Sequence, residues 1–219
     1  MGKIPILTKE QKTVLGEIAK INSFKDNFYF TGGTALAAFY LNHRLSEDLD
    51  FFSDHKFDNQ VILTLIEELS KKLQFKYQSN FREVVYIFNL TFKNGTKLKV
   101  DFGYYPYKRL RKGQILESIE IDSLFDIAVN KLQTVRQRSQ VKDFVDLYFL
   151  LKEFTLWDLM EGARVKFRME IDPYLVGVDF MKAEKFENLP KMIVPLKLSD
   201  LQSFYKNTAK KLGRRAVRE

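Results

Sequence analysis

The sequence has no cysteine, only two histidines and a single tryptophan in 219 residues. Because it lacks cysteine, the chain can form neither disulfide bonds nor thiolate metal sites. His43 and His55 are the only possible imidazole ligands, and two histidines make a poor zinc site. No apolar run approaches the ~18 residues of a membrane-spanning helix, and the first residues show no signal-peptide core. We therefore expect a cytoplasmic protein.

Basic residues outnumber acidic ones, 36 to 28, which gives a formal net charge of +8. A surplus of this size favours a polyanionic partner such as a nucleotide, RNA or DNA. A basic protein that is merely soluble fits the charge equally well. Hydrophobic residues make up 45% of the chain and include 20 phenylalanines, so a substantial core can form. The length is that of one large domain or two small ones.

Local patterns predict both strands and helices in the first half of the chain. Residues 8–11 form a capping box, which starts a helix, and the Lys-Asn-Gly-Thr run at 93–96 predicts a hairpin turn. We expect helices at 9–21, 34–41 and 59–73, and strands at 28–30, 49–52, 84–92 and 98–102.

The second half reads mainly as helices, at 124–138, 141–153, 156–167 and 201–212. The fold class is therefore α+β, and we place a domain boundary near residue 120. The chain ends in a basic tail that contains Lys206, Lys210, Lys211, Arg214, Arg215 and Arg218.

Two carboxylates, Asp48 and Asp50, stand two residues apart at the start of a predicted strand. On a strand they share one face, with Cα atoms roughly 6.6 Å apart. Adjacent carboxylates repel each other, and a cation between them relieves the repulsion. Hard oxygen ligands favour Mg²⁺ or Mn²⁺. The alternative is a solvated polar face of an edge strand.

The run Gly32-Gly33-Thr34 lies between a predicted strand and a predicted helix, fourteen residues before Asp48. Backbone N–H groups at such a turn bind phosphate oxygens, and glycine permits close approach. Thr34 can add a hydroxyl donor. The alternative is an ordinary turn between a strand and a helix.

Asp101 is a third candidate carboxylate, on a strand that we expect in the same sheet. Period-two alternation places it on one face with Lys99, opposite Val100. A third ligand from a neighbouring strand suits a two-metal site, in which one ion clamps a triphosphate and the other activates a hydroxyl. Taken alone, Asp101 fits an exposed strand residue as well.

Charged residues recur on the first two helices of the second half. Asp143 and Asp146 are three apart, which makes them neighbours on one helix face. Lys131, on the preceding helix, could balance the charge of a triphosphate, and Lys142 competes with it for this role. The alternative is that all these charges lie on solvated helix faces.

In this order, the motifs resemble those of the nucleotidyltransferase superfamily that includes DNA polymerase β, and most of all its AbiEii/AbiGii-type toxin branch. The matching stretches are FTGGTALA at 30–37, HRLSEDLDFF at 43–52, VDF at 100–102 and KDFVDL at 142–147. The resemblance spans roughly residues 28–152. One departure is mild, because Thr34 stands where the superfamily commonly has serine and keeps the hydroxyl.

The resemblance implies a polymerase-β-like mixed sheet with flanking helices, followed by a helical C-terminal half. The nucleotidyltransferase core would be residues 1–120 and the helical domain residues 121–219. It implies metal ligands at Asp48, Asp50 and Asp101. Lys131 and Asp143 would complete the catalytic set, and the nucleotide would contact Gly32, Gly33, Thr34, Arg44, Ser46, Lys142 and Asp146.

We therefore expect a toxin of a toxin–antitoxin or abortive-infection system that uses Mg²⁺ or Mn²⁺. It would transfer a nucleoside monophosphate from a nucleoside triphosphate to RNA, with a tRNA 3′ end as the expected acceptor, and a cognate antitoxin protein would be its partner. Three alternatives stay open. The acceptor could be a small molecule or a protein, the Asp-x-Asp pair could belong to a sugar-nucleotide glycosyltransferase, or the chain could be an inactive module that binds nucleic acid or a partner.

Ser46 lies two residues before Asp48, so strand alternation would place it on the carboxylate face. Phosphorylation there would add about −1.5 to −2 charge beside the predicted metal ligands and block triphosphate binding. A Ser46→Glu variant with full activity would contradict this hypothesis. The alternative is that Ser46 simply caps the loop.

Overall fold

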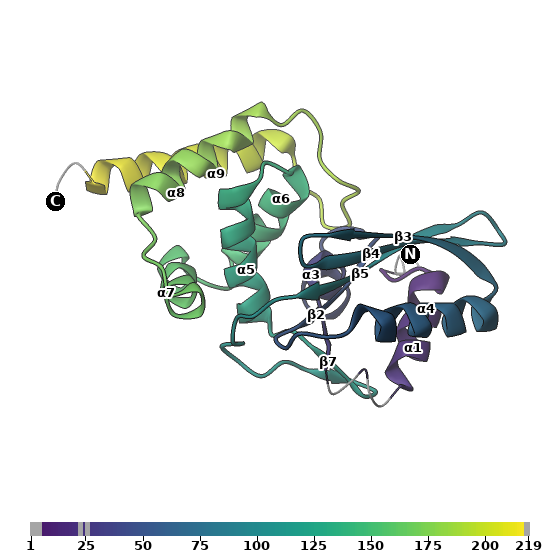
Figure 1. Cartoon of the computed structure of the whole chain (residues 1–219). Coiled ribbons are helices and arrows are strands. Elements are labelled where there is room, and N and C mark those ends of the chain that lie inside the picture. The colour runs from purple at the N-terminus through teal and green to yellow at the C-terminus, as the bar shows by residue number, and fades with distance from the viewer. Residues whose placement is uncertain (1–5, 22–23, 25–26, 217–219) are drawn as a thin grey trace. The chain divides into compact units, whose positions relative to one another are not determined.

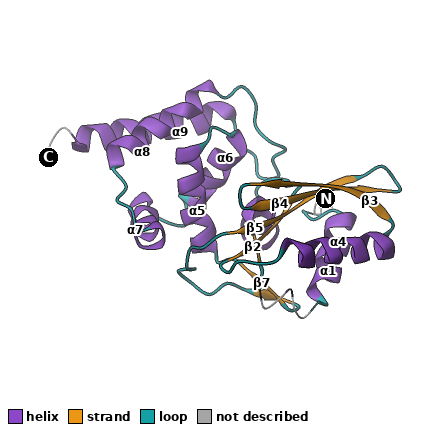
Figure 2. Cartoon of the chain, in the orientation of Figure 1, coloured by secondary structure: helices purple, strands orange, loops and turns teal. Residues whose placement is uncertain are grey.

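The computed structural model describes residues 6–21, 24 and 27–216, and the chain divides into two compact units. The sheet unit comprises residues 1–40, 46–108 and 112–123, and the helical unit comprises residues 41–45, 109–111 and 124–219. All strands drawn in Figure 2 belong to the sheet unit. A division into domains at residue 120 stays a prediction, because compact units need not fold independently.

Within the described residues, the sheet unit contains one mixed sheet of seven strands in the order β3-β4-β5-β2-β1-β7-β6. Strands β2 and β5 run parallel, as do β1 and β7, and the other neighbours are antiparallel. The strands are β1 (Tyr29–Thr31), β2 (Leu49–Ser53), β3 (Phe75–Arg82), β4 (Val85–Phe92), β5 (Lys97–Tyr104), β6 (Ile115–Leu116) and β7 (Ile119–Ile121).

Helices α1 (Lys9–Ala19) and α4 (Asn59–Leu73) lie side by side on one face of this sheet (Figure 1). The predicted capping box at Thr8 starts α1, and Asp58 caps α4. Below them the core is aromatic: the ring centroid of Phe24 lies 5.1 Å from that of Phe51 and 5.8 Å from that of Phe102. The opposite face of the sheet carries Asp50 and Asp101.

Helix α3 (Gly32–Leu36) follows β1 directly and continues as a π-helical turn, Ala37–Leu41. We predicted a helix only from residue 34. Gly32 has φ +77°, a conformation that favours glycine, so the chain bends into the helix at the first glycine.

Strand β3 is an element that the sequence analysis does not predict. Its run Phe-Lys-Tyr-Gln-Ser-Asn-Phe-Arg alternates, but only Phe75 is buried, so the apolar signal is weak. It pairs with β4 along eight residues and forms one edge of the sheet.

The helical unit packs its helices around buried aromatic side chains. Tyr205 is fully buried, donates a hydrogen bond of 2.7 Å to the carbonyl oxygen of Phe144, and contacts the ring of Phe180. The elements are α5 (Leu124–Gln137), α6 (Val141–Leu150), α7 (Leu156–Phe167), α8 (Pro173–Phe180), a 3₁₀ turn (Met181–Lys185) and α9 (Leu198–Ala216).

Most predicted elements are confirmed, and their ends differ by a few residues. The helix at 59–73, the helix at 156–167 and the hairpin turn at 93–96 stand as predicted. The helix expected at 141–153 ends at Leu150, while α9 is longer than predicted and α8 was not predicted. None of the described helices is both long and apolar enough to cross a membrane.

Candidate active site

Two of the predicted carboxylates lie directly opposite each other on neighbouring strands. Asp50 of β2 and Asp101 of β5 are direct register partners, and Thr31 of β1 is the partner of Asp50 on the other side. The register of β2 against β5 brings this about, because the side chains of register partners on neighbouring strands point to the same face of a sheet. Asp50 is half-exposed and Asp101 is 8% exposed.

Gly32 is fixed as glycine by its contact with Asp50. A Cβ atom on Gly32 would lie 2.8 Å from Cγ of Asp50 and closer still to Oδ2. The positive φ of Gly32 already disfavours any other residue. The backbone of the glycine turn and the Asp50 carboxylate are therefore held against each other, which is what a shared triphosphate and cation site requires.

Thr34 joins the glycine turn to the other carboxylate. It is fully buried, and its hydroxyl donates a hydrogen bond to the backbone carbonyl oxygen of Asp48. This bond holds the entry to β2 against α3 and so positions Asp48, which precedes the strand and is half-exposed. The predicted contact between Thr34 and a phosphate stays a prediction.

Lys99 lies among the three carboxylates and pairs with Asp101. Although partial burial of the ammonium acts in the opposite direction, the ion pair with Asp101 and the nearby charges of Asp48 and Asp50 raise the pKa of Lys99. Strand alternation predicts that Lys99 shares a face with Asp101, and the ion pair confirms that the two side chains meet.

The possible metal ligands here are the carboxylate oxygens of Asp48, Asp50 and Asp101, which lie near the ammonium of Lys99. Carboxylate oxygens suit a hard divalent cation. Among the described residues, no three acidic or histidine side chains are arranged to hold a metal ion as they stand. Asp101 is engaged by Lys99, so a metal that used all three carboxylates would have to displace that ammonium.

The charges predicted on α5 and α6 are buried in the helical unit rather than solvated. Asp146 is fully buried, and it lies 2.7 Å from Lys131 Nζ, 2.7 Å from His43 Nε2 and 2.6 Å from Arg44 Nε. Burial alone would raise the pKa of Asp146, but the charges of Lys131 and Arg44 hold it well below its ordinary value. The alternative of a solvated helix face is therefore wrong for Asp146.

Asp143 belongs to the same cluster. It is fully buried and accepts from Lys131 Nζ at 2.8 Å and from Arg138 Nε at 2.8 Å. Burial opposes ionisation, yet these two cations lower the pKa of Asp143. Lys131 is 7% exposed, and despite its burial the two aspartates raise its pKa. Both aspartates pair with Lys131, which confirms the prediction that Asp143 and Asp146 are neighbours on one helix face.

His43 and Arg44 precede the Asp48/Asp50 pair in the sequence but contact Asp146 of α6. Residues 41–45 leave the sheet unit and belong to the helical unit, where Arg44 makes an isolated β-bridge to Met192 and pairs with Asp146. The resemblance implies that Arg44 contacts the nucleotide, and this stays a prediction. The sequence carries one signal for the contact with Asp146, because the basic pair at 43–44 and the acidic residues of the run at 142–146 have opposite charges.

The remaining predicted residues are placed as follows. Ser46 is half-buried, and its backbone carbonyl oxygen accepts a 3.0 Å hydrogen bond from the Gln11 side chain. Gly33 and Lys142 are half-exposed. Lys142 is thus the more accessible of the two lysines proposed for the phosphates, and the choice between it and Lys131 stays open.

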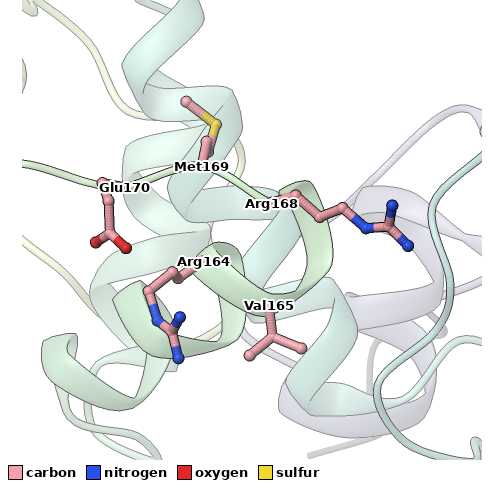
Figure 3. A pocket seen from close by; sticks show the side chains of 5 residues that line it. All are labelled: Arg164, Val165, Arg168, Met169 and Glu170. Atoms are coloured by element: carbon pink, nitrogen blue, oxygen red, sulfur yellow. The ribbon is translucent and has the colours of Figure 1, made fainter.

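A separate hollow lies at the end of α7, with a volume of about 390 Å³. It is lined by Arg164, Val165, Arg168, Met169 and Glu170, and the two arginines point apart (Figure 3). Arg164 is bound to Glu161 at 2.6 Å. None of the predicted site residues lines this hollow, and we assign it no part in catalysis.

Comparisons with known proteins identify the family of the chain. The family described as "Nucleotidyl transferase AbiEii toxin, Type IV TA system" matches residues 14–202. A protein of Aquifex aeolicus (strain VF5), described as uncharacterized, is 36% identical over 159 residues, which are 71% of each sequence.

Two solved structures from Helicobacter pylori share the fold. One, described as a nucleotidyltransferase, has a TM-score of 0.59 and 20% identity, and the match covers 95% of this chain and 97% of that one. The other, JHP933, has a TM-score of 0.56 and 21% identity, with 95% and 94% covered. The fold is that of the polymerase-β-like nucleotidyltransferases, and the chain belongs to the AbiEii nucleotidyltransferase toxin family.

Proposed function

We propose that this protein is a metal-dependent toxin that transfers a nucleoside monophosphate from a nucleoside triphosphate to an RNA acceptor, with a tRNA 3′ end as the expected site. The observation that carries the proposal is the row formed by Asp50 and Asp101, with the backbone of Gly32 held against Asp50. A cognate antitoxin protein is the expected partner of a toxin from this family.

The proposed reaction exchanges one phosphorus–oxygen bond for another. The acceptor hydroxyl oxygen attacks the α-phosphorus, and the bond from that phosphorus to the bridging oxygen of the β-phosphate breaks, so pyrophosphate leaves. The hydroxyl proton passes to a carboxylate, for which we assign Asp101, and from there to water. In-line transfer of this kind depends mainly on positioning and charge stabilisation.

Residues at different places in the fold have different proposed roles. The backbone N–H groups of Gly32 and Gly33 would bind the triphosphate, since glycine allows close approach. Asp48, Asp50 and Asp101 would hold Mg²⁺ or Mn²⁺, which, when bound, neutralises charge and lowers the pKa of the attacking hydroxyl. Lys99 orients the carboxylate of Asp101, because the two form an ion pair.

The helical unit supplies a basic surface for the acceptor. Lys210, Lys211 and Arg214 are exposed on α9, while Ala209 and Leu212 of the same helix are buried. Contacts between such cations and RNA phosphates make binding fall with rising salt. Deletion of the chain after Lys206 would also remove Ala209 and Leu212 from the core, so substitution of the exposed cations is the cleaner test.

Incubation of purified protein with each α-³²P-labelled nucleoside triphosphate, Mg²⁺ and total cellular RNA tests the proposal. Label should enter a tRNA-sized band with wild type and should be lost in an Asp48→Ala/Asp50→Ala variant. Asp54→Ala removes an exposed carboxylate just after β2 and should label like wild type. If wild type binds the triphosphate but labels no RNA, the RNA acceptor is wrong and the acceptor is a protein or a small molecule.

A further inference from the structure

The face of the sheet that carries Asp50 and Asp101 continues past them across two more strands. Asp101 of β5 is the register partner of Ile87 of β4, which in turn is the partner of Asn80 of β3. A second row lies beside it, from Lys99 to Asn89 to Gln78. Because side chains of register partners point to the same face, both rows share the carboxylate side.

This side of β3 and β4 is exposed, whereas the other side is buried or half-buried along β4 and exposed on β3 only at Ser79 and Phe81. Lys76, Gln78, Asn80 and Arg82 of β3 are all exposed, and so is Asn89 of β4. The opposite side bears Phe88 and Leu90 of β4, both fully buried, and Tyr77, whose hydroxyl lies 3.5 Å from Glu67 of α4. Helix α4 therefore lies against the side that bears Tyr77, and the carboxylate side of β3 is exposed along its length.

The open side has a particular composition. It presents three amides, Gln78, Asn80 and Asn89, and four cations, which are Lys76, Arg82, Lys97 and Lys99. On β3, β4 and β5, Asp101 is the one acidic side chain with this orientation. We call the surface made by Lys76, Gln78, Asn80, Arg82 and Asn89 the amide platform.

The composition fits a single-stranded nucleic acid. Cations can contact phosphates, while amides can donate to and accept from the edges of unpaired bases. Paired bases in an A-form helix do not offer those edges to a flat surface, so sequence-dependent RNA contacts fall on unpaired segments. A protein partner would call for an apolar centre, and here the apolar side chains are the half-buried Val85 and Ile87.

The dimensions match a few nucleotides. Neighbouring strands lie about 4.8 Å apart, so β3 is about 10 Å from β5. A stacked strand rises about 3.4 Å per nucleotide, and about three nucleotides therefore span this distance. An acceptor whose terminal hydroxyl lies at Asp101 would place its preceding nucleotides over β4 and β3.

We propose that the amide platform binds the unpaired 3′-terminal nucleotides of the RNA acceptor, directly upstream of the attacking hydroxyl. The inference rests on the proposed function, since it takes the hydroxyl to lie at Asp101. It assigns the amides to base edges and Lys76 and Arg82 to phosphates.

The test measures RNA binding in the full chain that carries Asp48→Ala/Asp50→Ala, so that no transfer occurs. The probe is a fluorescein-labelled RNA hairpin with a four-nucleotide unpaired 3′ end, compared with the same hairpin without it. The amide variant is Gln78→Ala/Asn80→Ala/Asn89→Ala, and the cation variant is Lys76→Ala/Arg82→Ala. The control, Gln60→Ala/Lys71→Ala, removes an exposed amide and an exposed cation from α4, on the covered side.

The amide variant should bind the overhang hairpin at least about tenfold more weakly, with an unchanged salt slope, and the blunt hairpin as before. The cation variant should reduce the slope of log K against log salt by about 1.4, or about 0.7 for each phosphate contact. The control should bind both hairpins like the parent protein. Equal binding of the overhang hairpin by the parent and the amide variant would overturn the proposal.

A failure of the platform proposal can be distinguished from a failure of the proposed transfer reaction. If wild type transfers nucleotides to RNA while the amide variant keeps the wild-type KM for RNA, the platform is wrong and the activity stands. If wild type labels no RNA but the overhang hairpin binds through the platform, the platform stands and the transfer reaction is wrong.

Discussion

A Cβ atom on Gly32 would lie 2.8 Å from Cγ of Asp50, closer than real Cβ atoms approach a neighbour. Gly32 is the first residue of α3, directly after β1, and Asp50 lies on β2, the antiparallel neighbour of β1. The backbone proposed to bind phosphate and the carboxylate proposed to bind metal are thus in direct contact. A side chain at residue 32 would therefore displace the Asp50 carboxylate.

Replacement of Gly32 by alanine should abolish activity and leave the fold largely intact. The new methyl group must push the Asp50 carboxylate aside, and a φ of +77° disfavours alanine by about 1 kcal/mol. We expect kcat for nucleotidyl transfer to fall at least about a hundredfold, since the displacement acts on positioned groups. Gly16→Ala on α1, where a Cβ meets nothing within 4 Å, is the matched control. Near-normal transfer by Gly32→Ala would show that Asp50 is not held in its catalytic place by this contact.

Lys99 should compete with metal for Asp101. Because its ammonium is paired with Asp101 among three carboxylates, a divalent cation must displace a positive charge that is already there. Removal of the charge in Lys99→Met should strengthen Mn²⁺ binding about fivefold, which corresponds to about 1 kcal/mol for a half-exposed pair. Calorimetric titration with Mn²⁺ and no nucleotide measures this directly. Weaker or unchanged Mn²⁺ binding would mean that Lys99 supports the metal site instead of competing for it.

The sequence allowed the local elements and the motif residues to be predicted, because hydrophobic alternation, caps and turns are properties of neighbouring residues. It could not show that β2 pairs with β5 or in which register, so only the structure places Asp50 directly opposite Asp101. The sequence was also compatible with Lys131, Asp143 and Asp146 lying on solvated helix faces. Their burial depends on residues 43 and 44, about a hundred positions earlier, and no periodicity reports that contact.

The buried cluster of the helical unit should govern its stability. Asp146→Asn removes a buried negative charge that compensates Arg44 and, together with Asp143, Lys131. Breaking such a group costs about 3–5 kcal/mol. Urea unfolding should show a loss of this size, and Asp200→Asn, at an exposed position near the start of α9, should show almost none. A loss below about 1 kcal/mol would mean that the cluster is not held by ion pairing.

The same cluster predicts how stability depends on acid. The pKa of Asp143 and that of Asp146 are lowered from the ordinary value of 3.8, so the folded state binds protons less readily than the unfolded state. Their contribution is therefore fully present above about pH 5 and is lost progressively as the pH falls through 3.8 and below. The free energy of unfolding of Asp146→Asn should fall less steeply between pH 5 and pH 3 than that of wild type. Parallel curves over that range would contradict an ionised Asp146 in the folded protein.

The exposed cations of α9 should set the salt dependence of RNA binding without any effect on the nucleotide. Lys210, Lys211 and Arg214 lie on the solvent side of the helix, so their replacement by alanine leaves the buried Tyr205, Ala209 and Leu212 in place. Each lost phosphate contact lowers the slope of log K against log salt by about 0.7–0.9, so the triple variant should lower it by about 2.1–2.7. We expect KM for tRNA to rise while KM for the triphosphate stays constant, and Lys71→Ala on α4 serves as the control. If the salt slope did not change, the acceptor would not lie on α9, and the RNA would have to be held by other basic surfaces such as the amide platform.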